Sequence, residues 1–337
     1  MSGVGQFIRG QLSTPPKPQV DLTGRTILVT GANSGLGLEA AKLLAQLNCD
    51  TIILACRSLT KGETAKQTIL QSIPSGSRGR PQATFVVFEL DLCSFASVVA
   101  FSERCKDLPR LDAAILNAGV DLEEFTLAEG YETTLTVNVI STFLLATLLV
   151  PVMRGSAKKY NITPTLAIVG SAVHFAANHK DLTTPAEGQI FKTLSDPKKA
   201  DMKGRYFLSK LSVMLLVKHL ASTLTKSAEQ DPNNKALVVV NNVAPGLCKT
   251  NLFQTHAETS TKVMLSIIGR SSEHGARTLV HGATAGRETH GQYLSECQVK
   301  KYSPFVKSAE GDQTARRIWE ELSVIYEELK PGCTKEL

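Results

Sequence analysis

Length, composition and charge narrow the classes of protein to which this chain can belong. It has 337 residues, of which 42% are hydrophobic, so it can bury a substantial core. The net charge of +6 is modest and its lysines and arginines are spread along the chain, so we expect no nucleic-acid binding. Seven scattered cysteines without a C-x-x-C pair predict reduced thiols in a cytoplasmic protein, with neither a disulfide framework nor a metal site.

The two ends of the chain differ from its middle. Three prolines within residues 1–20 predict a flexible leader on the surface. We expect neither a secretory signal nor a membrane span, because the longest apolar run, Phe143–Met153, falls well short of the roughly 20 residues that a bilayer requires. Residues 21–300 contain neither a break in composition nor a repeat, so we predict one domain there, followed by a helical extension over residues 301–337.

Short apolar runs rich in β-branched residues alternate with longer stretches of helical spacing. The runs are continuous, as in strands covered on both faces, and predict strands over Thr26–Thr30, Thr51–Ala55, Thr84–Phe88, Ala113–Leu116, Thr165–Gly170 and Ala236–Asn241. Helices are expected over Leu36–Leu47, Phe95–Lys106, Gly130–Met153 and Tyr206–Thr225. This alternation predicts an α/β fold, a Rossmann-type doubly wound parallel sheet. Ligands of such sheets bind beyond the carboxyl ends of the strands.

A glycine-rich turn directly follows the first predicted strand and leads into an apolar helix. Glycines let the backbone approach a pyrophosphate closely, and the helix N-terminus offers unpaired N–H groups. The residues that we predict to hold the phosphates of a dinucleotide are Gly31, Asn33, Ser34, Gly35, Leu36 and Gly37. Their spacing departs from the commoner Gly-x-Gly-x-x-Gly pattern, and a turn that uses glycine only for its conformation is the alternative.

The end of the second predicted strand indicates which dinucleotide binds. Folds that bind NAD usually place an acidic residue there, roughly 20 residues after the glycine turn, to hold the ribose 2′-hydroxyl. This chain has Arg57 instead, with Lys61 nearby. A guanidinium attracts a 2′-phosphate, so we predict NADP(H) as cofactor; the alternative is a solvated surface charge.

Two further strand ends carry candidate cofactor contacts. Asp91 and Leu92 follow the third predicted strand and are expected near the adenine, although Asp91 could equally cap the next helix. Asn117, Ala118 and Gly119 follow the fourth strand and form a tight turn beside the expected nicotinamide.

A tyrosine and a lysine lie one helical turn apart at the start of a predicted helix. The i, i+4 spacing of Tyr206 and Lys210 places the phenol and the ammonium on one helix face. A free phenol has a pKa of about 10, and a neighbouring ammonium is expected to lower it toward neutral pH. Taken alone, this pair also arises by chance in many helices.

The combination of these motifs, in this order, resembles the short-chain dehydrogenase/reductase family over roughly Asp21–Glu296. The elements that carry the resemblance are the glycine turn, Asn117-Ala118-Gly119, Asn138, Ser171, Tyr206 with Lys210, and Pro245-Gly246. Within the family the sequence is similar to the retinol-dehydrogenase-like branch and to fungal members associated with secondary metabolism.

The resemblance implies a catalytic tetrad of Asn138, Ser171, Tyr206 and Lys210. It assigns Tyr206 as the proton donor to a carbonyl oxygen and Ser171 as a hydrogen-bond partner of that oxygen. Lys210 would lower the pKa of Tyr206 and hold the nicotinamide ribose, and Asn138 would position a water that relays protons to Lys210.

The resemblance also places Pro245 and Gly246 near the nicotinamide carboxamide, and Thr250 near the carboxamide or the pyrophosphate. The segment Leu247–Arg270 is apolar, which suggests a lipophilic substrate or, equally, a helix packed on the core or on another subunit.

The stretch between Ser171 and Tyr206 is longer than in compact members of the family. We expect residues 172–205 to form a loop near the pocket mouth. His174 and His179 within it are interpreted as loop or pocket-wall residues rather than metal ligands.

These observations predict an NADP(H)-dependent oxidoreductase that interconverts a carbonyl and an alcohol on a lipophilic small molecule, acting as a ketone or aldehyde reductase in secondary metabolism. The alternative is an NADP-binding protein with a non-redox role, such as a cyclase or a cofactor-sensing interaction protein. Self-association into a homo-oligomer is compatible with either function.

Overall fold

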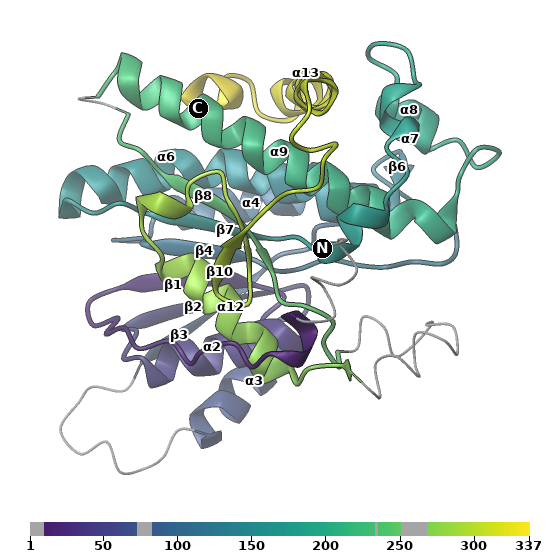
Figure 1. The fold of residues 1–337 in the computed structure, drawn as a ribbon. Coiled ribbons are helices and arrows are strands. Elements are labelled where there is room, and N and C mark those ends of the chain that lie inside the picture. Colours follow the sequence, from purple (N-terminus) through teal and green to yellow (C-terminus); the bar gives the residue numbers. More distant parts are fainter. Residues whose placement is uncertain (1–9, 73–82, 233–234, 251–267) are drawn as a thin grey trace.

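The computed structural model describes residues 10–72, 83–232, 235–250 and 268–337, and within them eight strands form one sheet in the order β10-β9-β8-β7-β4-β1-β2-β3 (Figure 1). Neighbouring strands are parallel except for the antiparallel pair β9 and β10 at one edge. The strands are β1 (Thr26–Thr30), β2 (Thr51–Cys56), β3 (Thr84–Glu89), β4 (Ala113–Leu116), β7 (Thr165–Val169), β8 (Val239–Ala244), β9 (Tyr293–Ser295) and β10 (Gln298–Lys300). The predicted α/β fold with a doubly wound parallel sheet is confirmed.

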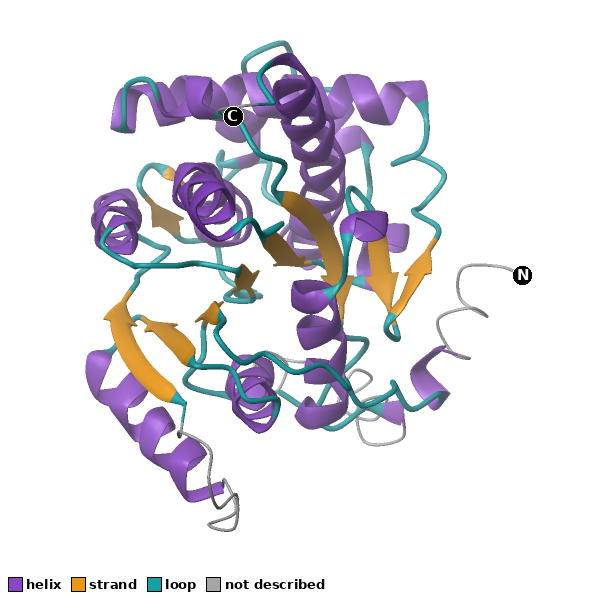
Figure 2. Cartoon of the chain, turned by 90° about the vertical axis from the view of Figure 1, so that its left-hand side faces the viewer, coloured by secondary structure: helices purple, strands orange, loops and turns teal. Residues whose placement is uncertain are grey.

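Helices cover both faces of this sheet (Figures 1 and 2). On one face lie α2 (Gly35–Gln46), α3 (Leu59–Ser72) and α12 (Ser272–Thr284). On the other lie α4 (Phe95–Lys106), α6 (Thr142–Tyr160) and α9 (Met202–Gln230), and α13 (Ala309–Leu329) packs on α9. The shorter elements are β5 (Leu127–Ala128), β6 (Tyr131–Glu132), α5 (Thr133–Leu135), α7 (Lys180–Thr183), α8 (Ile190–Leu194), the π-helix η1 (Thr136–Ser141), and the 3-10 helices η2 (Ala172–Ala176), η3 (Arg287–Thr289) and η4 (Cys333–Glu336).

The strands have apolar side chains on both faces because each face has its own core. Along β1, Ile27 and Val29 pack into the cluster beneath α2 and α12, whereas Leu28 packs into the cluster beneath α4, α6 and α9. All three are 0–1% exposed, and burying such a side chain stabilises the fold by about 1.5–3 kcal/mol. The continuous apolar runs of the sequence follow from this two-sided burial.

The helix expected over Gly130–Met153 begins later, changes type and ends later. The buried Glu132 accepts hydrogen bonds from the backbone N–H groups of Thr134 and Leu135, and this cap sets the start at Thr133. The next six residues form the π-helix η1, and α6 then continues to Tyr160. A period of 3.6 residues predicts a helix here but not its local widening.

The sixth predicted strand is displaced by three residues, because β8 spans Val239–Ala244 instead of Ala236–Asn241. It includes two fully buried asparagines, Asn241 and Asn242, which look unlike strand residues in the sequence. The Asn241 amide donates to Gly282 O at 2.9 Å and to Thr289 Oγ1 at 3.0 Å, which offsets the cost of burying it.

The stretch over 172–205 is more regular than the expected loop, since it contains η2, α7, α8 and the first turn of α9. His174 within it is 2% exposed and does not line the pocket, so its interpretation as a loop or pocket-wall residue is wrong. Its Nδ1 lies 2.8 Å from Ser171 O, and its Nε2 accepts from the Ser303 N–H at 3.3 Å. Burial lowers the pKa of His174 to about 4, so the ring is neutral. His179 stacks on Phe305, with ring centroids 4.3 Å apart.

The two terminal segments are held against the domain. Most of residues 10–20 are exposed, as expected of a leader, but Gln11 is only 4% exposed. Its amide donates to Leu247 O at 2.7 Å and to Ile268 O at 2.8 Å, so this part is anchored rather than flexible. At the other end α13 spans Ala309–Leu329, and its Tyr326 hydroxyl donates to Ile140 O at 2.8 Å inside the core.

Two helical stretches of the described chain, Thr133–Tyr160 and Met202–Gln230, are long and apolar enough to cross a membrane. The fold buries 89% and 72% of their most apolar windows. Their hydrophobicity is therefore accounted for by packing against the sheet and against each other.

Candidate active site

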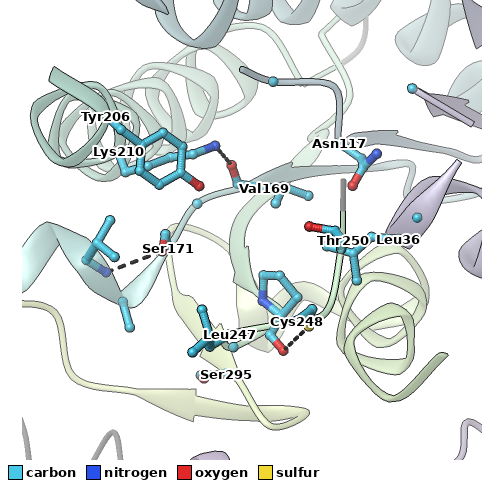
Figure 3. A pocket seen from close by; sticks show the side chains of 18 of the residues that line it. Leu36, Asn117, Val169, Ser171, Tyr206, Lys210, Leu247, Cys248, Thr250 and Ser295 are labelled. Atoms are coloured by element: carbon cyan, nitrogen blue, oxygen red, sulfur yellow. Dashed lines mark hydrogen bonds between the residues drawn. The ribbon is translucent and has the colours of Figure 1, made fainter. Parts of the chain in front are cut away.

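A cavity of about 630 Å³ opens at the carboxyl ends of β1, β4, β7 and β8. It lies where the chain order reverses between β1 and β4, the position at which open α/β sheets bind their ligands. Figure 3 shows Tyr206, Lys210 and Ser171 along one side, and Asn117, Thr250 and Leu36 along the other. Predicted residues that line it are Gly31, Asn33, Ser34, Gly35, Leu36, Asn117, Ala118, Gly119, Ser171, Tyr206, Lys210, Pro245, Gly246 and Thr250.

The glycine turn has the geometry of a phosphate cradle. Gly31 and Gly35 have φ angles of +66° and +53°, which only glycine adopts readily, and a Cβ on Gly31 would lie 3.2 Å from the Ala118 backbone. Ser34 caps α2 without a side-chain hydrogen bond, so the first N–H groups of this helix are left to face the cavity. An oxyanion of a dinucleotide would satisfy these donors, so the residues present fit such a ligand.

Gly37 does not line the cavity, and its predicted role in cofactor binding stays a prediction. A Cβ at this position would lie 2.4 Å from Gly31 O and 2.8 Å from Asn117 Nδ2. Gly37 therefore lets α2 pack closely on the turn, which supports the cradle indirectly.

A second hollow, of about 290 Å³, adjoins the first near the ends of β2 and β3. It brings together the four residues predicted to bind the adenosine half of the cofactor: Arg57, Lys61, Asp91 and Leu92. Asp91 is held by a turn in which its Oδ1 accepts from the Cys93 N–H at 2.9 Å. Since Gly31, Asn33, Ala118 and Gly119 line both spaces, one extended ligand can occupy them together.

Thr30, which the sequence analysis did not single out, connects the ends of β1 and β4. Its hydroxyl oxygen accepts from the backbone N–H groups of Asn117 and Ala118, both at 2.9 Å. The Asn117 amide donates back to Thr30 O at 2.9 Å. Both strand ends are thereby fixed beneath the cavity.

The tyrosine and lysine of α9 lie on one face of the helix, as predicted. The Lys210 Nζ atom lies 5.6 Å from the centroid of the Tyr206 ring and donates to Val169 O at 2.9 Å. A side-chain hydrogen bond joins Tyr206 to Ser171, whose Oγ also accepts from the Val173 N–H at 3.3 Å. Phenol, hydroxyl and ammonium therefore meet at the end of β7 (Figure 3).

Burial decides how these groups titrate. Burial and the nearby Asp121 carboxylate raise the pKa of Tyr206 above its usual range, and the hydrogen bond with Ser171 opposes this only in part. Burial lowers the pKa of Lys210 to about 8. The lowering of the Tyr206 pKa expected from Lys210 is outweighed here by burial, so the phenol is protonated at neutral pH.

Asn138 lies in the π-helix and is 1% exposed. Its Oδ1 accepts from the Val120 N–H at 2.8 Å, and its Nδ2 donates to Val120 O at 2.8 Å and to Ser209 Oγ at 3.1 Å. A Cβ on Gly119 would lie 2.9 Å from Asn138 Oδ1 and 3.8 Å from Lys210 Nζ. Asn138 thus fixes the loop after β4 beside Lys210, while the water relay expected of it stays a prediction.

A buried ion pair joins Glu132, at the end of β6, to Arg205 beside Tyr206 in α9. Arg205 Nε lies 3.3 Å from Glu132 Oε2, and their side chains are 2% and 0% exposed. The guanidinium also donates to Leu194 O at 2.7 Å, and Ser195 Oγ accepts from the Glu132 N–H at 2.9 Å. The 172–205 stretch is therefore tied to the starts of α5 and α9.

Comparison with known proteins agrees with this geometry. The family model described as short chain dehydrogenase matches residues 25–177. The short chain dehydrogenase/reductase dmxR8 of Cryptosporiopsis sp. (strain 8999) is 38% identical over 97% of this chain and 98% of its own length. The short-chain dehydrogenase anuD of Penicillium roqueforti (strain FM164) is also 38% identical, over 97% and 84%.

The chain belongs to the short-chain dehydrogenase/reductase family. Solved structures share the fold of this short-chain dehydrogenase/reductase at lower identity. A 3-oxoacyl-(acyl-carrier-protein) reductase from Agrobacterium tumefaciens C58 with NADP bound has a TM-score of 0.58 and 19% identity over 81% of this chain and 93% of its own. Salutaridine reductase from Papaver somniferum has a TM-score of 0.57 and 20% identity, over 80% of this chain and 99% of its own.

The site also contains residues that the sequence analysis missed. Asp121 acts electrostatically on both Tyr206 and Lys210, and burial raises its own pKa to about 6, with Glu123 adding to the effect and Lys210 opposing it. Further lining residues come from η2 and from the β9–β10 edge, namely Val173, Phe175, Ala176, Tyr293, Ser295, Glu296 and Lys300. A strand expected at Tyr293–Ser295 would have pointed to the last four, because cavity residues follow strand ends.

Pro245, Gly246 and Thr250 lie in the cavity wall, as the resemblance implied. Gly246 has a φ of +80°, and a Cβ there would lie 2.7 Å from Arg270 Nη1 and 2.8 Å from Gln11 Oε1. Its glycine is therefore needed where the leader, β8 and Arg270 meet. Residues 251–267, which make up most of the apolar Leu247–Arg270 segment, lie outside the described residues.

Proposed function

We propose that this short-chain dehydrogenase/reductase is an NADP(H)-dependent reductase of ketones or aldehydes on lipophilic small molecules, acting in secondary metabolism. The observation that carries the proposal is the protonated Tyr206 phenol, hydrogen-bonded to Ser171 at the wall of the cavity that also contains the glycine turn. A protonated acid beside a dinucleotide cradle is the state that carbonyl reduction requires at its start.

The residues of this chain divide the reaction between them. When bound, the cofactor supplies a hydride to the carbonyl carbon. Tyr206 gives its proton to the carbonyl oxygen, so that the product is an alcohol and the phenol becomes a phenolate. Ser171 holds the same oxygen and stabilises the negative charge that develops on it. Lys210 lies next to the phenolate as it forms, and its ammonium lowers the cost of that charge.

Support for NADP(H) comes from the second hollow. Arg57 and Lys61 line it, and Asp91 in the same wall has one carboxylate oxygen engaged by the Cys93 N–H. Two cations against one carboxylate favour a 2′-phosphate over a 2′-hydroxyl. Support for a lipophilic substrate comes from the apolar lining near Ser171, which includes Val173, Phe175 and Leu247.

The test is a screen of lipophilic ketones and aldehydes with NADPH absorbance as readout. Tyr206→Phe should lower turnover by about 10²-fold or more while NADPH affinity changes little, because only the proton donor is lost. Tyr160→Phe is the matched control, since this tyrosine ends α6 and lines neither cavity. A fully active Tyr206→Phe would refute the proposed acid. Product formation without NADPH consumption would instead favour a non-redox role such as cyclisation.

A further inference from the structure

The far end of the cavity is formed by the turn that joins β9 and β10. Ser295, Glu296 and Lys300 from this hairpin line the cavity, and Figure 3 shows Ser295 on the side away from Tyr206 and Lys210. Glu296 and Cys297 occupy the two turn positions with φ angles of +51° and +56°. Hairpin turns of this kind normally use Asn and Gly, because positive φ angles strain other residues. Such strain persists where the surroundings hold it, and often at ligand sites.

The surroundings of Glu296 hold it in place and neutralise it. Its Oε1 lies 3.3 Å from Arg270 Nη2 and accepts from the Ser295 hydroxyl at 2.8 Å. Arg270 is itself buried and donates further to Pro245 O at 3.2 Å and to Ser13 O at 3.3 Å. The negative charge of Glu296 is therefore balanced by the Arg270 guanidinium.

Within the part of the chain that the structure describes, Lys300, unlike Glu296, has no charged partner within 3.5 Å. Its ammonium donates to Gln298 Oε1 at 2.8 Å and stands 4.0 Å from Glu296 Oε2. An ammonium has three N–H donors, so Lys300 retains hydrogen-bonding capacity toward the cavity that it lines. Arg270, Glu296 and Lys300 together carry a net charge of +1, which makes this end of the cavity attractive to an anion.

The hydride-transfer end of the cavity carries Ser171, Tyr206 and Lys210. Between the two ends the wall is largely apolar, with Phe175, Leu247 and Tyr293 among its residues. A substrate with an apolar body and an acidic group would therefore place its acidic group at the hairpin end, next to Lys300.

We propose that Lys300 binds an anionic oxygen of the substrate, a carboxylate or an ionised phenol, at the end of the molecule remote from the reacting carbonyl. The substrate class is thus an amphipathic carbonyl compound with an apolar middle and an acidic far end. This inference rests on the proposed reductase function and adds to it the group that orients the substrate.

The experiment compares kcat/KM, with NADPH as cofactor, within two series of ketones that differ only in the remote group. The first series is 4-acetylbenzoate, its methyl ester and 4-hydroxyacetophenone. The second is 6-acetyl-2-naphthoic acid, its methyl ester and 6-acetyl-2-naphthol. Wild type should prefer the acid of a series to its ester. Lys300→Met should lower kcat/KM for the acid by about tenfold, as expected for loss of one charge-assisted hydrogen bond, and leave the ester unchanged. Lys300→Arg should retain the preference, and Lys301→Met, at the exposed neighbouring position, should behave as wild type.

The outcomes separate the two proposals. Turnover of acid and ester at equal rates in both wild type and Lys300→Met would overturn the role of Lys300 and leave the reductase intact. Failure of every compound to oxidise NADPH would count against the reductase itself. If wild type prefers the phenol to the ester at pH values where the phenol is ionised, and Lys300→Met lacks this preference there, the bound group is a phenolate. A preference of wild type for the acid identifies the bound group as a carboxylate.

Discussion

Removing one member of the buried pair Arg205 and Glu132 should destabilise this protein more than any surface change. Arg205→Met leaves the Glu132 carboxylate, which is 0% exposed, without its counter-charge. That carboxylate also accepts from the N–H groups of Thr134 and Leu135, so it cannot turn toward water without uncapping α5. Breaking a buried ion pair from one side typically costs about 3–5 kcal/mol of unfolding free energy, and we expect a loss in this range.

The coupling free energy between Arg205 and Glu132 tests the argument more directly than either single variant. Glu132→Gln alone leaves the buried Arg205 guanidinium with only Leu194 O and the new glutamine amide as partners, so this variant should also lower the free energy of unfolding. The double variant buries no net charge, so it should be less unstable than the sum of the single variants by about 1–3 kcal/mol. Arg316→Met, at an exposed position of α13, is the control and should change stability by no more than about 0.5 kcal/mol.

Urea unfolding followed by circular dichroism measures these differences from the transition midpoints. Activity adds a second readout, because Arg205 directly precedes Tyr206 and shares its helix. We expect Arg205→Met to lower kcat under conditions where the variant is fully folded. Additive single effects, or a double variant less stable than their sum, would refute the argument that the pair acts as a unit.

The remaining predictions concern the cofactor and acid stability. Arg57→Ala should weaken NADPH binding by about tenfold or more and leave NADH binding nearly unchanged, measured by nicotinamide fluorescence; equal weakening of both would contradict a 2′-phosphate contact. Burial lowers the pKa of His174 from 6.5 to about 4, so the unfolded chain binds more protons than the native one between these values and stability is lost as the pH falls through them. His174→Gln should therefore lose less stability than wild type between pH 6.5 and 4 in urea titrations, and parallel losses would show that His174 does not charge on unfolding.

The parts of the site that could be predicted from the sequence depend on local geometry. The phosphate turn follows from glycine spacing after a strand, and the shared face of Tyr206 and Lys210 follows from helical periodicity. Arg57 and Asn117 could be placed because each comes directly after a strand, and parallel strands bring their carboxyl ends to one edge. Local rules of this kind act over a few residues, so they need no knowledge of packing.

Only the tertiary structure decided the rest, because it depends on which distant segments meet. Lys300 lines the cavity from the β9–β10 hairpin, and Asp121 acts on Tyr206 and Lys210 from the loop after β4. Neither residue stands in a local pattern that marks it. The titration of Tyr206 also belongs to this class: the sequence shows the lysine one turn away, but the burial that raises the phenol's pKa comes from surrounding elements. Desolvation depends on all the atoms packed around a group, and a one-dimensional pattern does not contain them.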